Sequence, residues 1–375
     1  MTMRVIMTGG GTGGHINPAI AIANTIRDSI EGSEIIFVGT PNGLENKLVP
    51  AAGYEIRHVE IQGIKRSLSP KNIKTAYLAA VSPYKAKKII KEFRPDIVIG
   101  TGGYVCWPVL RAASMVGIPS VIHESNAVPG VAVKMLAGYV DRILVNFEET
   151  GSYISQKDKI IHVGNPLLGG FLCVGRDEAR EKLGVSGCGQ YILSYGGSLG
   201  AEKVNEAVLD LMKIYSSVEK GIRHVHATGS IEHETFMKDF AESGLVGNGN
   251  IEVLEYIYDM PLRMAAADVV ISRAGAMTVS ELSMMGKASI MIPSPNVTNN
   301  HQYKNAKVLE DAGASVLIEE KDLSGERLAE EIRKLRDDPV RTGRMEESIG
   351  RFSVRDSNSR ILDIIIGLTE SRKNS

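Results

Sequence analysis

The amino-acid sequence predicts an α/β protein with two Rossmann-like, doubly wound parallel-sheet domains that face each other across a cleft. Three observations lead to this fold class. Short runs of β-branched residues alternate with longer amphipathic stretches along the whole chain, which is typical of parallel sheets with helical crossovers. The series restarts near the middle, and 375 residues suffice for two domains with a core each. Glycine-rich turns recur where predicted strands end.

The individual elements follow from these runs. In the first half of the chain we expect strands at residues 5–7, 35–38, 56–59, 97–99, 120–122 and 143–145. In the second half we expect them at residues 191–194, 223–227, 251–253, 269–271, 289–292 and 315–318. Each run is followed by turn-forming residues and a helical pattern, so consecutive strands are expected to run parallel.

The domain boundary is predicted at the turn-forming segment Gly164-Asn165-Pro166. The first domain is then residues 1–163 and the second is residues 164–354. An apolar helical pattern within residues 355–370 has no strand after it. We expect this last helix to pack back on the first domain.

Composition and charge narrow the function classes. Hydrophobic residues make up 43% and charged residues 23% of the chain, as in ordinary globular proteins. The net charge of −1 argues against a protein that coats nucleic acid. Three widely spaced cysteines indicate neither a disulfide framework nor a zinc site and fit a reducing cytoplasm. The first strand begins almost at the N-terminus and no apolar run reaches 18 residues, so we expect a protein neither secreted nor membrane-spanning.

The first glycine loop, residues 9–14, lies between a predicted strand and a predicted helix. Without Cβ atoms, such a loop can approach a ligand closely and direct backbone N–H groups at a phosphate on the helix N-terminus. Comparable loops occur at residues 102–103, 196–200 and 273–276. The alternative is that all are simple tight turns, but their recurrence at strand ends in both halves favours ligand loops lining the cleft.

Two common nucleotide-binding classes are disfavoured. Gly9, Gly11 and Gly14 match the dinucleotide fingerprint G-x-G-x-x-G, but the second strand ends in Val38-Gly39-Thr40-Pro41, with no acidic residue for a ribose. The chain also has no G-x-x-x-x-G-K-[ST] sequence, which argues against a P-loop nucleotidase.

Three side chains are candidates for chemistry. His15 ends the first glycine loop, where a neutral imidazole kept neutral by the helix dipole could deprotonate an incoming hydroxyl; the alternative is a cap or a packed residue. Ser198 could bind phosphate oxygens at a helix start, or be only an N-cap serine. Glu281 could accept hydrogen bonds from two ribose hydroxyls, or be an exposed helical residue.

A basic segment runs from Lys65 to Lys91 and contains eight Lys or Arg residues and no Asp or Glu. Its apolar members Ile73, Tyr77, Val81 and Tyr84 recur at helical spacing, although Pro83 could kink the helix. An apolar face flanked by positive charge is typical of docking on an anionic membrane surface. The alternative is a solvated helix whose apolar face belongs to the core.

Seven motifs span nearly the whole chain in a fixed order: Gly9-Gly10-Gly11-Thr12-Gly13-Gly14-His15-Ile16-Asn17-Pro18; Gly102-Gly103-Tyr104-Val105; His123-Glu124-Ser125-Asn126; Gly164-Asn165-Pro166; Gly196-Gly197-Ser198-Leu199-Gly200-Ala201; Arg273-Ala274-Gly275-Ala276-Met277-Thr278-Val279-Ser280-Glu281; and His301-Gln302-Tyr303-Lys304-Asn305-Ala306. Together they resemble the peptidoglycan N-acetylglucosaminyltransferase family.

The resemblance implies a glycosyltransferase-B fold and inverting transfer of N-acetylglucosamine from UDP-N-acetylglucosamine to an undecaprenyl-diphosphate-linked muramoyl pentapeptide. The product is the β-1,4-linked disaccharide lipid precursor of peptidoglycan, needed for cell shape and division. The resemblance also implies a peripheral protein at the cytoplasmic face of the cell membrane. The family pattern requires no cofactor and no metal site.

The resemblance further implies roles for particular residues. The first domain would face the acceptor and the membrane, with His15 as base and Glu124 and Asn126 beside it; the second would hold the UDP-sugar. The implied substrate-binding residues are Thr12, Gly13, Gly14, Tyr104, Asn126, Asn165, Ser198, Tyr256, Ile257, Ala276, Met277, Thr278, Glu281, Gln302 and Asn305. Of these, Tyr256 and Ile257 would surround the uracil, Glu281 would bind the ribose, and Gln302 and Asn305 would contact the sugar. The implied membrane contacts are Ile73, Tyr77, Val81, Tyr84, Lys85 and Lys88.

Two positions depart from the family pattern. Leu168 stands where many members have an arginine, so one cationic contact to the nucleotide is missing. Cys106-Trp107 stands where small residues are common, and Trp107 could alter acceptor packing or membrane contact. The alternatives are another UDP-sugar enzyme of the same fold, either an epimerase or a glycolipid glycosyltransferase, and a sensor that binds the nucleotide sugar without turnover.

Overall fold

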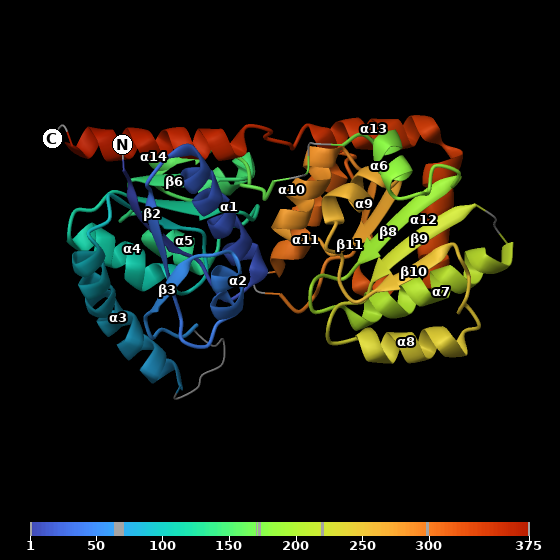
Figure 1. Ribbon diagram of the computed structural model, residues 1–375, viewed down its shortest axis with the longest axis horizontal. Helices are drawn as coiled ribbons and strands as arrows, with labels where there is room; N and C mark the ends of the chain where they lie inside the picture. The colour runs from blue at the N-terminus through green and yellow to red at the C-terminus, as the bar shows by residue number, and fades with distance from the viewer. Residues whose placement is uncertain are drawn as a thin grey trace. The chain divides into compact units, whose positions relative to one another are not determined.

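A computed structural model of the chain describes residues 2–63, 71–169, 171, 174–218, 221–297 and 300–373 (Figure 1). The chain forms two compact units, one of Met1–Leu168 with Val354–Ser375 and the other of Gly169–Ser353. Each unit contains a parallel sheet covered by helices, which confirms the two predicted doubly wound parallel-sheet domains.

The first unit has a parallel sheet in which, among the described residues, seven strands follow the order β3-β2-β1-β4-β5-β6-β7. The strands are β1 (Arg4–Thr8), β2 (Glu34–Gly39), β3 (Glu55–His58), β4 (Ile97–Gly100), β5 (Ser120–Glu124), β6 (Arg142–Val145) and β7 (Ile160–His162). The helices are α1 (Gly13–Ser29), α2 (Glu45–Ala51), α3 (Lys71–Phe93), α4 (Cys106–Met115), α5 (Val131–Leu136) and α14 (Ser357–Lys373), with short 3-10 turns η1 (Glu148–Tyr153) and η2 (Lys157–Lys159).

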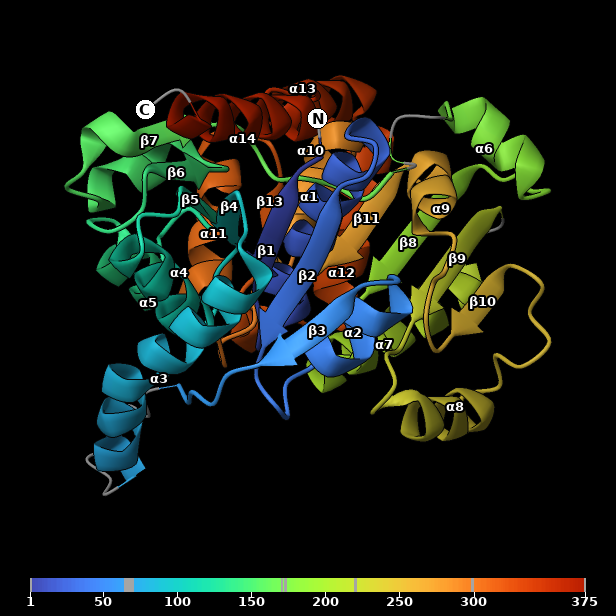
Figure 2. The same ribbon diagram turned by 60° about the vertical axis from the view of Figure 1, so that its left-hand side comes forward.

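Both faces of this sheet are buried, which explains why its strands are apolar runs. On β1, Val5 and Met7 belong to the hydrophobic cluster that includes α1 and α14, whereas Ile6 belongs to the cluster under α3, α4 and α5. Ile361 and Ile365 attach α14 to the first of these clusters, and α14 crosses against α1 in Figures 1 and 2.

The unit boundaries differ by a few residues from those expected at 163/164 and 354/355, because the segment after Val163 stays with the first unit. Leu167 is 8% exposed there, and its carbonyl oxygen accepts a hydrogen bond from Asn358 Nδ2 at 3.1 Å. Gly164 adopts φ +77°, and a Cβ at this position would lie 2.5 Å from Val354 Cβ. The chain therefore enters the second unit only after Leu168.

The second unit has a parallel sheet of six strands within the described residues, in the order β10-β9-β8-β11-β12-β13. The strands are β8 (Gln190–Tyr195), β9 (Ile222–Ala227), β10 (Ile251–Leu254), β11 (Val269–Ser272), β12 (Ser289–Met291) and β13 (Val316–Leu317). The helices are α6 (Arg176–Lys182), α7 (Glu202–Val218), α8 (His233–Glu242), α9 (Met260–Ala266), α10 (Ala276–Met285), α11 (His301–Asp311), α12 (Gly325–Asp337) and α13 (Pro339–Gly350), with the 3-10 turn η4 (Glu320–Asp322).

Each sheet reverses its strand order once, between β1 and β4 in the first unit and between β8 and β11 in the second. In open α/β sheets, ligands bind at such reversal points, outside the carboxyl ends of the strands. The loops at these reversal points are residues 9–12 and 101–105 in the first unit and residues 196–201 and 273–275 in the second. No helix in the described part of the chain is long and apolar enough to cross a bilayer.

Candidate active site

The glycine loop after β1 packs directly on the loop after β4. Thr8 pairs in register with Gly100, so the two loops leave the sheet side by side. A Cβ on Gly9 would lie 2.1 Å from Thr101 Oγ1, and one on Gly103 would lie 2.3 Å from the carbonyl oxygen of Gly10. Only glycine permits this approach, which also places the loop before the first turn of α1.

The N-terminus of α1 has the features of an anion-binding site. The N-cap residue Thr12 makes no side-chain capping hydrogen bond, and the first turn contains no acidic residue. Thr12 and Gly14 are exposed and Gly13 is half-buried. Backbone N–H groups and the helix dipole favour negative charge at this point.

His15 is held in one orientation at the start of α1. Its Nδ1 atom lies 3.1 Å from the carbonyl oxygen of Thr101, and Thr101 Oγ1 donates to the carbonyl oxygen of His15 at 2.6 Å. Because a carbonyl oxygen only accepts, Nδ1 carries the proton in the neutral ring. Nε2 is then the proton acceptor, as a general base requires.

Sequence reasoning missed Glu45, which supports the glycine loop from α2. Its side chain is 1% exposed, and its carboxylate accepts hydrogen bonds from Thr40 N at 2.9 Å, Thr40 Oγ1 at 2.7 Å and Gly11 N at 3.2 Å. Burial acts to raise the pKa of Glu45, but these hydrogen bonds hold it below its ordinary value. No spacing rule marks this residue, because its partners lie on two other segments.

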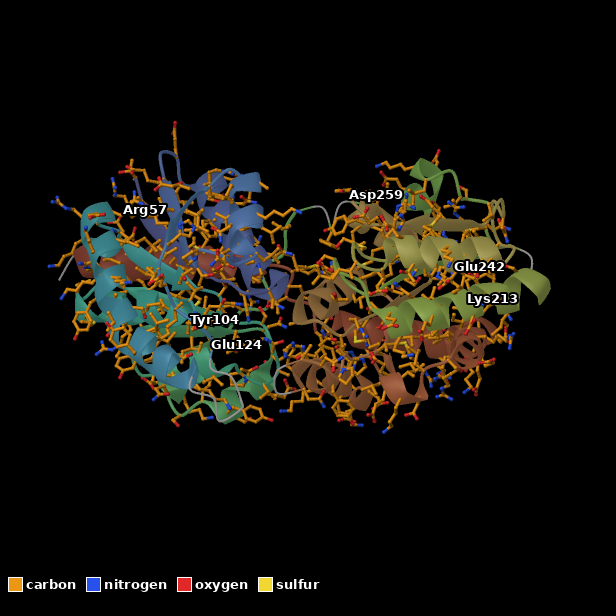
Figure 3. The ribbon with its side chains drawn as sticks, turned by 90° about the horizontal axis from the view of Figure 1, so that it is seen from below. Arg57, Tyr104, Glu124, Lys213, Glu242 and Asp259 are labelled. Atoms are coloured by element: carbon orange, nitrogen blue, oxygen red, sulfur yellow. The ribbon has the colours of Figure 1, made fainter. Side chains whose placement is uncertain are left out.

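Glu124 and Asn126 form a second polar group at the end of β5, beside the β4 loop that carries Tyr104 (Figure 3). Glu124 is 3% exposed, and its carboxylate accepts from Asn126 N and Asn126 Nδ2, both at 2.9 Å, and from Gly130 N at 2.8 Å. These contacts make Glu124 a residue that shapes the loop after β5. Tyr104 lies next to the glycine loop, since a Cβ on Gly11 would be 3.5 Å from its ring.

His123, on β5, and Asn165, after β7, are both buried. The ring of His123 donates through Nε2 to the carbonyl oxygen of Gly164 at 2.9 Å. Burial lowers the pKa of His123 to about 4, so the ring is neutral at physiological pH. His123 therefore connects β5 to the segment, containing Asn165, that leaves the first unit.

In the second unit, the glycine loop after β8 packs on the loop after β9. A Cβ on Gly200 would lie 2.3 Å from the carbonyl oxygen of Thr228. The carbonyl oxygens of Ser198 and Leu199 accept from Ser230 N and Ile231 N, each at 3.1 Å. These hydrogen bonds fix the backbone of the loop. The exposed Ser198 side chain lies just before the N-terminus of α7.

Ala276, Met277 and Thr278 form the first turn of α10. The N-cap residue Gly275 provides no capping side chain, and the first turn has no acidic residue. Glu281 follows one turn later, and removal of its carboxyl group from water raises the pKa to about 8. An anion-binding helix start and an acceptor-only carboxylate thus lie on one short helix.

The remaining predicted donor-side residues lie on α11 and after β10. Gln302 Oε1 accepts from Ser294 N at 2.9 Å, and Asn305 Nδ2 donates to the carbonyl oxygen of Ala274 at 3.2 Å. Asn305 thereby connects α11 to the loop that begins α10. Tyr256 is 49% exposed and packs edge-on against the ring of Tyr258, whereas the Ile257 side chain is buried.

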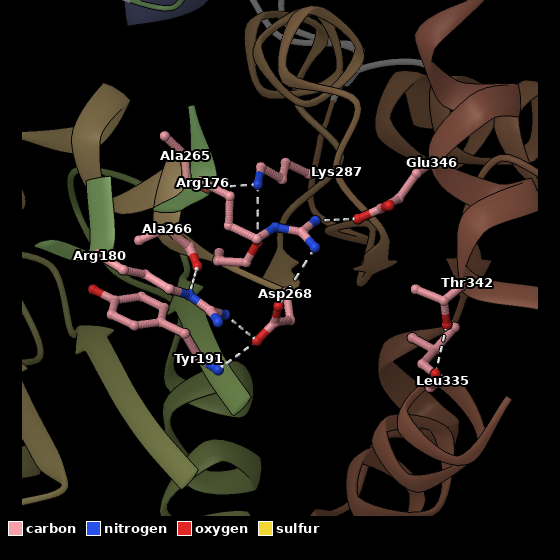
Figure 4. A network of polar contacts seen from close by, with 11 residues as sticks. Arg176, Arg180, Tyr191, Ala265, Ala266, Asp268, Lys287, Leu335, Thr342 and Glu346 are labelled. Atoms are coloured by element: carbon pink, nitrogen blue, oxygen red, sulfur yellow. Dashed lines mark hydrogen bonds and ion pairs between the residues drawn. The ribbon is translucent and has the colours of Figure 1, made fainter. Parts of the chain in front are cut away.

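Behind this site, a polar network fixes the amino-terminal ends of the strands (Figure 4). Asp268 accepts from Arg180 Nη2 and from Tyr191 N at 2.7 Å. Lys287 follows α10 and donates to the carbonyl oxygens of Ala265 and Ala267 at 2.6 and 2.9 Å. Burial lowers the pKa of Lys287 to about 7. The network holds β8, β11 and the end of α10 in fixed relation.

The predicted membrane residues lie on α3. Tyr77 and Tyr84 are 64% and 65% exposed, and Val81 is half-buried between them. Lys85 pairs with Glu60 at 3.2 Å, and Lys88 lies 3.9 Å from Glu92. Residues 64–70 and the Ile73 side chain lie outside what the structure describes.

The two departures from the family pattern have different surroundings. Trp107 donates through Nε1 to the carbonyl oxygen of Ala79 at 2.9 Å and packs edge-on against Tyr139, so its bulk connects α4 with α3. Leu168 is 40% exposed at the end of the first unit and offers no cation.

No cluster of three or more His, Cys, Asp or Glu side chains suited to a metal ion occurs among the described residues. At the starts of α1 and α10, backbone N–H groups without a side-chain cap are available as donors to an anion.

Comparisons with known proteins match both units. Residues 5–145 match the glycosyltransferase family 28 N-terminal domain, and residues 191–361 match the glycosyltransferase family 28 C-terminal domain. A relative in Acetivibrio thermocellus is 44% identical over 370 residues, which cover 99% of each chain; its name is UDP-N-acetylglucosamine--N-acetylmuramyl-(pentapeptide) pyrophosphoryl-undecaprenol N-acetylglucosamine transferase. A relative of the same name in Thermoanaerobacter sp. is 42% identical over 98% of this chain and 100% of its own length.

Two solved structures are similar along the whole chain. MurG of Acinetobacter baumannii has a TM-score of 0.76 at 28% identity and covers 97% of this chain and 99% of its own. A putative UDP-N-acetylglucosamine 2-epimerase of Listeria monocytogenes has a TM-score of 0.70 at 14% identity, with coverage of 99% and 98%. The second likeness concerns the fold alone.

Proposed function

The chain belongs to glycosyltransferase family 28, and on that premise we propose that it transfers N-acetylglucosamine from UDP-N-acetylglucosamine to an undecaprenyl-diphosphate-linked N-acetylmuramoyl pentapeptide. The relatives of 42–44% identity over nearly the whole chain support the substrates. The observation that carries the mechanism is the orientation of His15, whose Nδ1 faces the carbonyl oxygen of Thr101.

In the proposed reaction, a hydroxyl of the muramoyl acceptor attacks the anomeric carbon of the donor from the face opposite UDP. The new C–O bond forms as the bond to the UDP oxygen breaks, so the anomeric configuration inverts. The proton of the attacking hydroxyl passes to His15 Nε2. Negative charge moves onto the diphosphate of UDP, where N–H groups at the starts of α7 and α10 and the Ser198 hydroxyl stabilise it.

The other site residues have supporting roles in this proposal. Glu281 accepts hydrogen bonds from the ribose hydroxyls. The loop at Tyr256 and Ile257 surrounds the uracil, and Gln302 and Asn305 contact the sugar. On the acceptor side, Glu124 holds Asn126 and the loop after β5 in place. That no metal is needed stays a prediction; it requires that a chelator such as EDTA leave turnover unchanged.

Release of UDP from UDP-N-acetylglucosamine tests the proposal. We expect release only when a lipid-linked muramoyl acceptor is present. Sugar isomerisation without acceptor would instead indicate an epimerase, UDP release without acceptor would indicate hydrolysis of the donor by water, and binding without any turnover would indicate a sensor. The epimerase alternative has only a fold likeness in its favour.

We further propose that the first unit docks peripherally on the cytoplasmic face of the membrane through α3. The exposed rings of Tyr77 and Tyr84 lie seven residues apart on one side of the helix, beside Lys88. Aromatic rings and lysines suit the boundary between headgroups and acyl chains. Glu60 pairs with Lys85 and Glu92 with Lys88, which reduces the net positive charge of this surface. We therefore expect the tyrosine rings to contribute more to membrane binding, and the lysines less, than the number of lysines in the sequence suggests.

Sedimentation with anionic vesicles tests this docking. A variant with Lys85→Glu, Lys87→Glu and Lys88→Glu, and a second with Tyr77→Ser and Tyr84→Ser, should each sediment less. The matched control reverses Lys203, Lys213 and Lys238 in the second unit. Equal sedimentation of all variants and wild type would contradict membrane docking by α3.

A further inference from the structure

Two buried hydroxyl groups end neighbouring strands at the donor side of the second unit. Tyr195 is the last residue of β8 and Ser272 the last of β11, and the two pair in register. Tyr195 is 7% exposed and Ser272 is fully buried. Among the described residues, neither hydroxyl oxygen has a hydrogen-bond partner in acceptable geometry. A buried polar group without a hydrogen-bond partner lowers the free energy of unfolding, so a hydroxyl kept at such a position is a candidate for a functional role.

The polar groups around the Tyr195 hydroxyl belong to the proposed nucleotide site. The polar groups that act on it are the carboxyl of Glu281 and the hydroxyls of Thr278 and Ser272. Burial, and secondly the charge of Glu281, raise the pKa of Tyr195, so its hydroxyl keeps its proton and can donate. Thr278 and Glu281 both lie on α10, the helix whose start is proposed to bind the diphosphate.

Glu281 needs donors when it is ionised. A carboxylate has about four acceptor positions, and the two hydroxyls of a ribose fill about half of them. In this desolvated site a carboxylate with unfilled positions is costly. The Tyr195 hydroxyl is a buried donor on which the charge of Glu281 acts, and it makes no hydrogen bond in acceptable geometry within the described part of the chain, although the hydroxyls of Thr278 and Ser272 lie near it.

We propose that Tyr195 is a positioning residue for the donor nucleotide: its hydroxyl donates to the Glu281 carboxylate and orients it toward the vicinal diol of a nucleoside diphosphate. This inference rests on the proposed function, because it takes Glu281 as the ribose ligand. When the nucleotide binds, the hydrogen bond from the Tyr195 hydroxyl keeps the carboxylate in the orientation that accepts from the diol.

Tyr191 provides a matched control on the same strand. It lies four residues before Tyr195, is 1% exposed, and its hydroxyl also has no hydrogen-bond partner among the described residues. Its polar neighbours are Arg263 and Glu252, and its backbone belongs to the network around Asp268 (Figure 4). Tyr191→Phe therefore removes a buried hydroxyl from β8 without touching the surroundings of Glu281.

The experiment measures the dissociation constants of UDP and of 2′,3′-dideoxy-UDP, which lacks the diol, by calorimetry on the full chain. Wild type should prefer UDP. In Tyr195→Phe, UDP should bind about tenfold more weakly, the loss expected for one hydrogen bond to a charged group, while dideoxy-UDP binding changes less than about twofold. In steady-state assays, the same variant should raise the donor KM about as much and leave kcat within about twofold. Tyr191→Phe should match wild type in all these values.

Two results would overturn the inference: a Tyr195→Phe variant that keeps the wild-type preference for the diol, or a Tyr191→Phe variant that loses it equally. Failure of the proposed function looks different, because wild type itself would then not bind UDP. A purely structural role for the Tyr195 hydroxyl would weaken both ligands equally, which also contradicts positioning.

Discussion

His15 and Thr101 hold each other by two reciprocal contacts: His15 Nδ1 lies 3.1 Å from the Thr101 carbonyl oxygen, and Thr101 Oγ1 donates to the His15 carbonyl oxygen at 2.6 Å. One contact fixes the tautomer of the ring and the other fixes the backbone that carries it. The loops after β1 and β4, 86 residues apart in sequence, thereby form one rigid unit around the proposed base.

The first prediction concerns this base. His15→Ala should lower kcat by a factor of about 10² to 10⁴, the range for loss of a general base, and leave the affinity for UDP within about twofold. UDP release at saturating acceptor measures the rate. His58→Ala removes a histidine of the same unit whose Nε2 lies 2.6 Å from Asn46 Oδ1, and should leave kcat unchanged. Full turnover by the His15 variant would exclude the proposed role.

The second prediction tests the orientation of His15 without removing it. A Cβ on Gly102 would lie 2.5 Å from His15 Nδ1, so Gly102→Ala should displace the ring and lower kcat more than about tenfold. Gly117 also has a positive φ, but a Cβ there meets nothing within 4 Å. Gly117→Ala should therefore share the backbone strain and retain kcat, and equal losses in both variants would point to strain alone.

The third prediction concerns the pH dependence of donor binding. The carboxyl of Glu281 has a pKa raised to about 8 by burial, and its ionised form is the one proposed to bind the ribose. As pH rises from 7 to 8.5 the ionised fraction grows, so UDP should bind several-fold more tightly, by less than about tenfold per pH unit. The phosphate of UDP is already ionised in this range. Calorimetry should show that Glu281→Gln binds weakly and almost independently of pH; a pH dependence equal to that of wild type would be inconsistent with the assignment.

The fourth prediction concerns stability in acid and arises from a buried polar chain in the second unit. Tyr215 contacts His224 Nδ1, Ser194 Oγ lies 2.7 Å from His224 Nε2 and 2.8 Å from His226 Nδ1, and His226 Nε2 lies 3.1 Å from Asn205 Oδ1. Each histidine then donates once and accepts once, which requires neutral rings. Burial lowers the pKa of His224 well below its ordinary value and that of His226 to about 3.

Below pH 6.5 the unfolded chain binds a proton at each of these histidines and the folded chain does not, so stability falls as pH falls. Glu281 acts in the opposite direction, because its raised pKa makes the folded chain bind a proton between about pH 4.5 and 8. Urea unfolding at several pH values should therefore show a shallower slope in His226→Gln, smaller by up to about 1.4 kcal/mol per pH unit between pH 6 and 4.5. Identical slopes would mean that His226 is protonated in the folded chain.

Much of the fold and part of the site could be predicted from the sequence. The β-branched runs of β1, β4, β8 and β11 mark strands buried on both faces, because such strands need apolar residues at every position. The glycines of residues 9–14 also predict a close approach of two backbones, because such an approach leaves no room for a Cβ. His15 stands out as the titratable side chain at the end of that loop. These features depend on local periodicity or on one residue's own geometry.

Only the tertiary structure decided the partners of these groups. The sequence does not indicate that Glu45 accepts a hydrogen bond from Gly11, that Glu124 accepts from Asn126 and Gly130, or that the charge of Glu281 acts on the Tyr195 hydroxyl. The physical reason is that a buried polar group is defined by what it contacts, and those contacts join elements whose distance along the chain carries no information about their distance in space. The sequence by itself determined which segments form strands and which positions require glycine. Packing in the tertiary structure decided which carboxylates accept hydrogen bonds from loops and which are available to bind substrate.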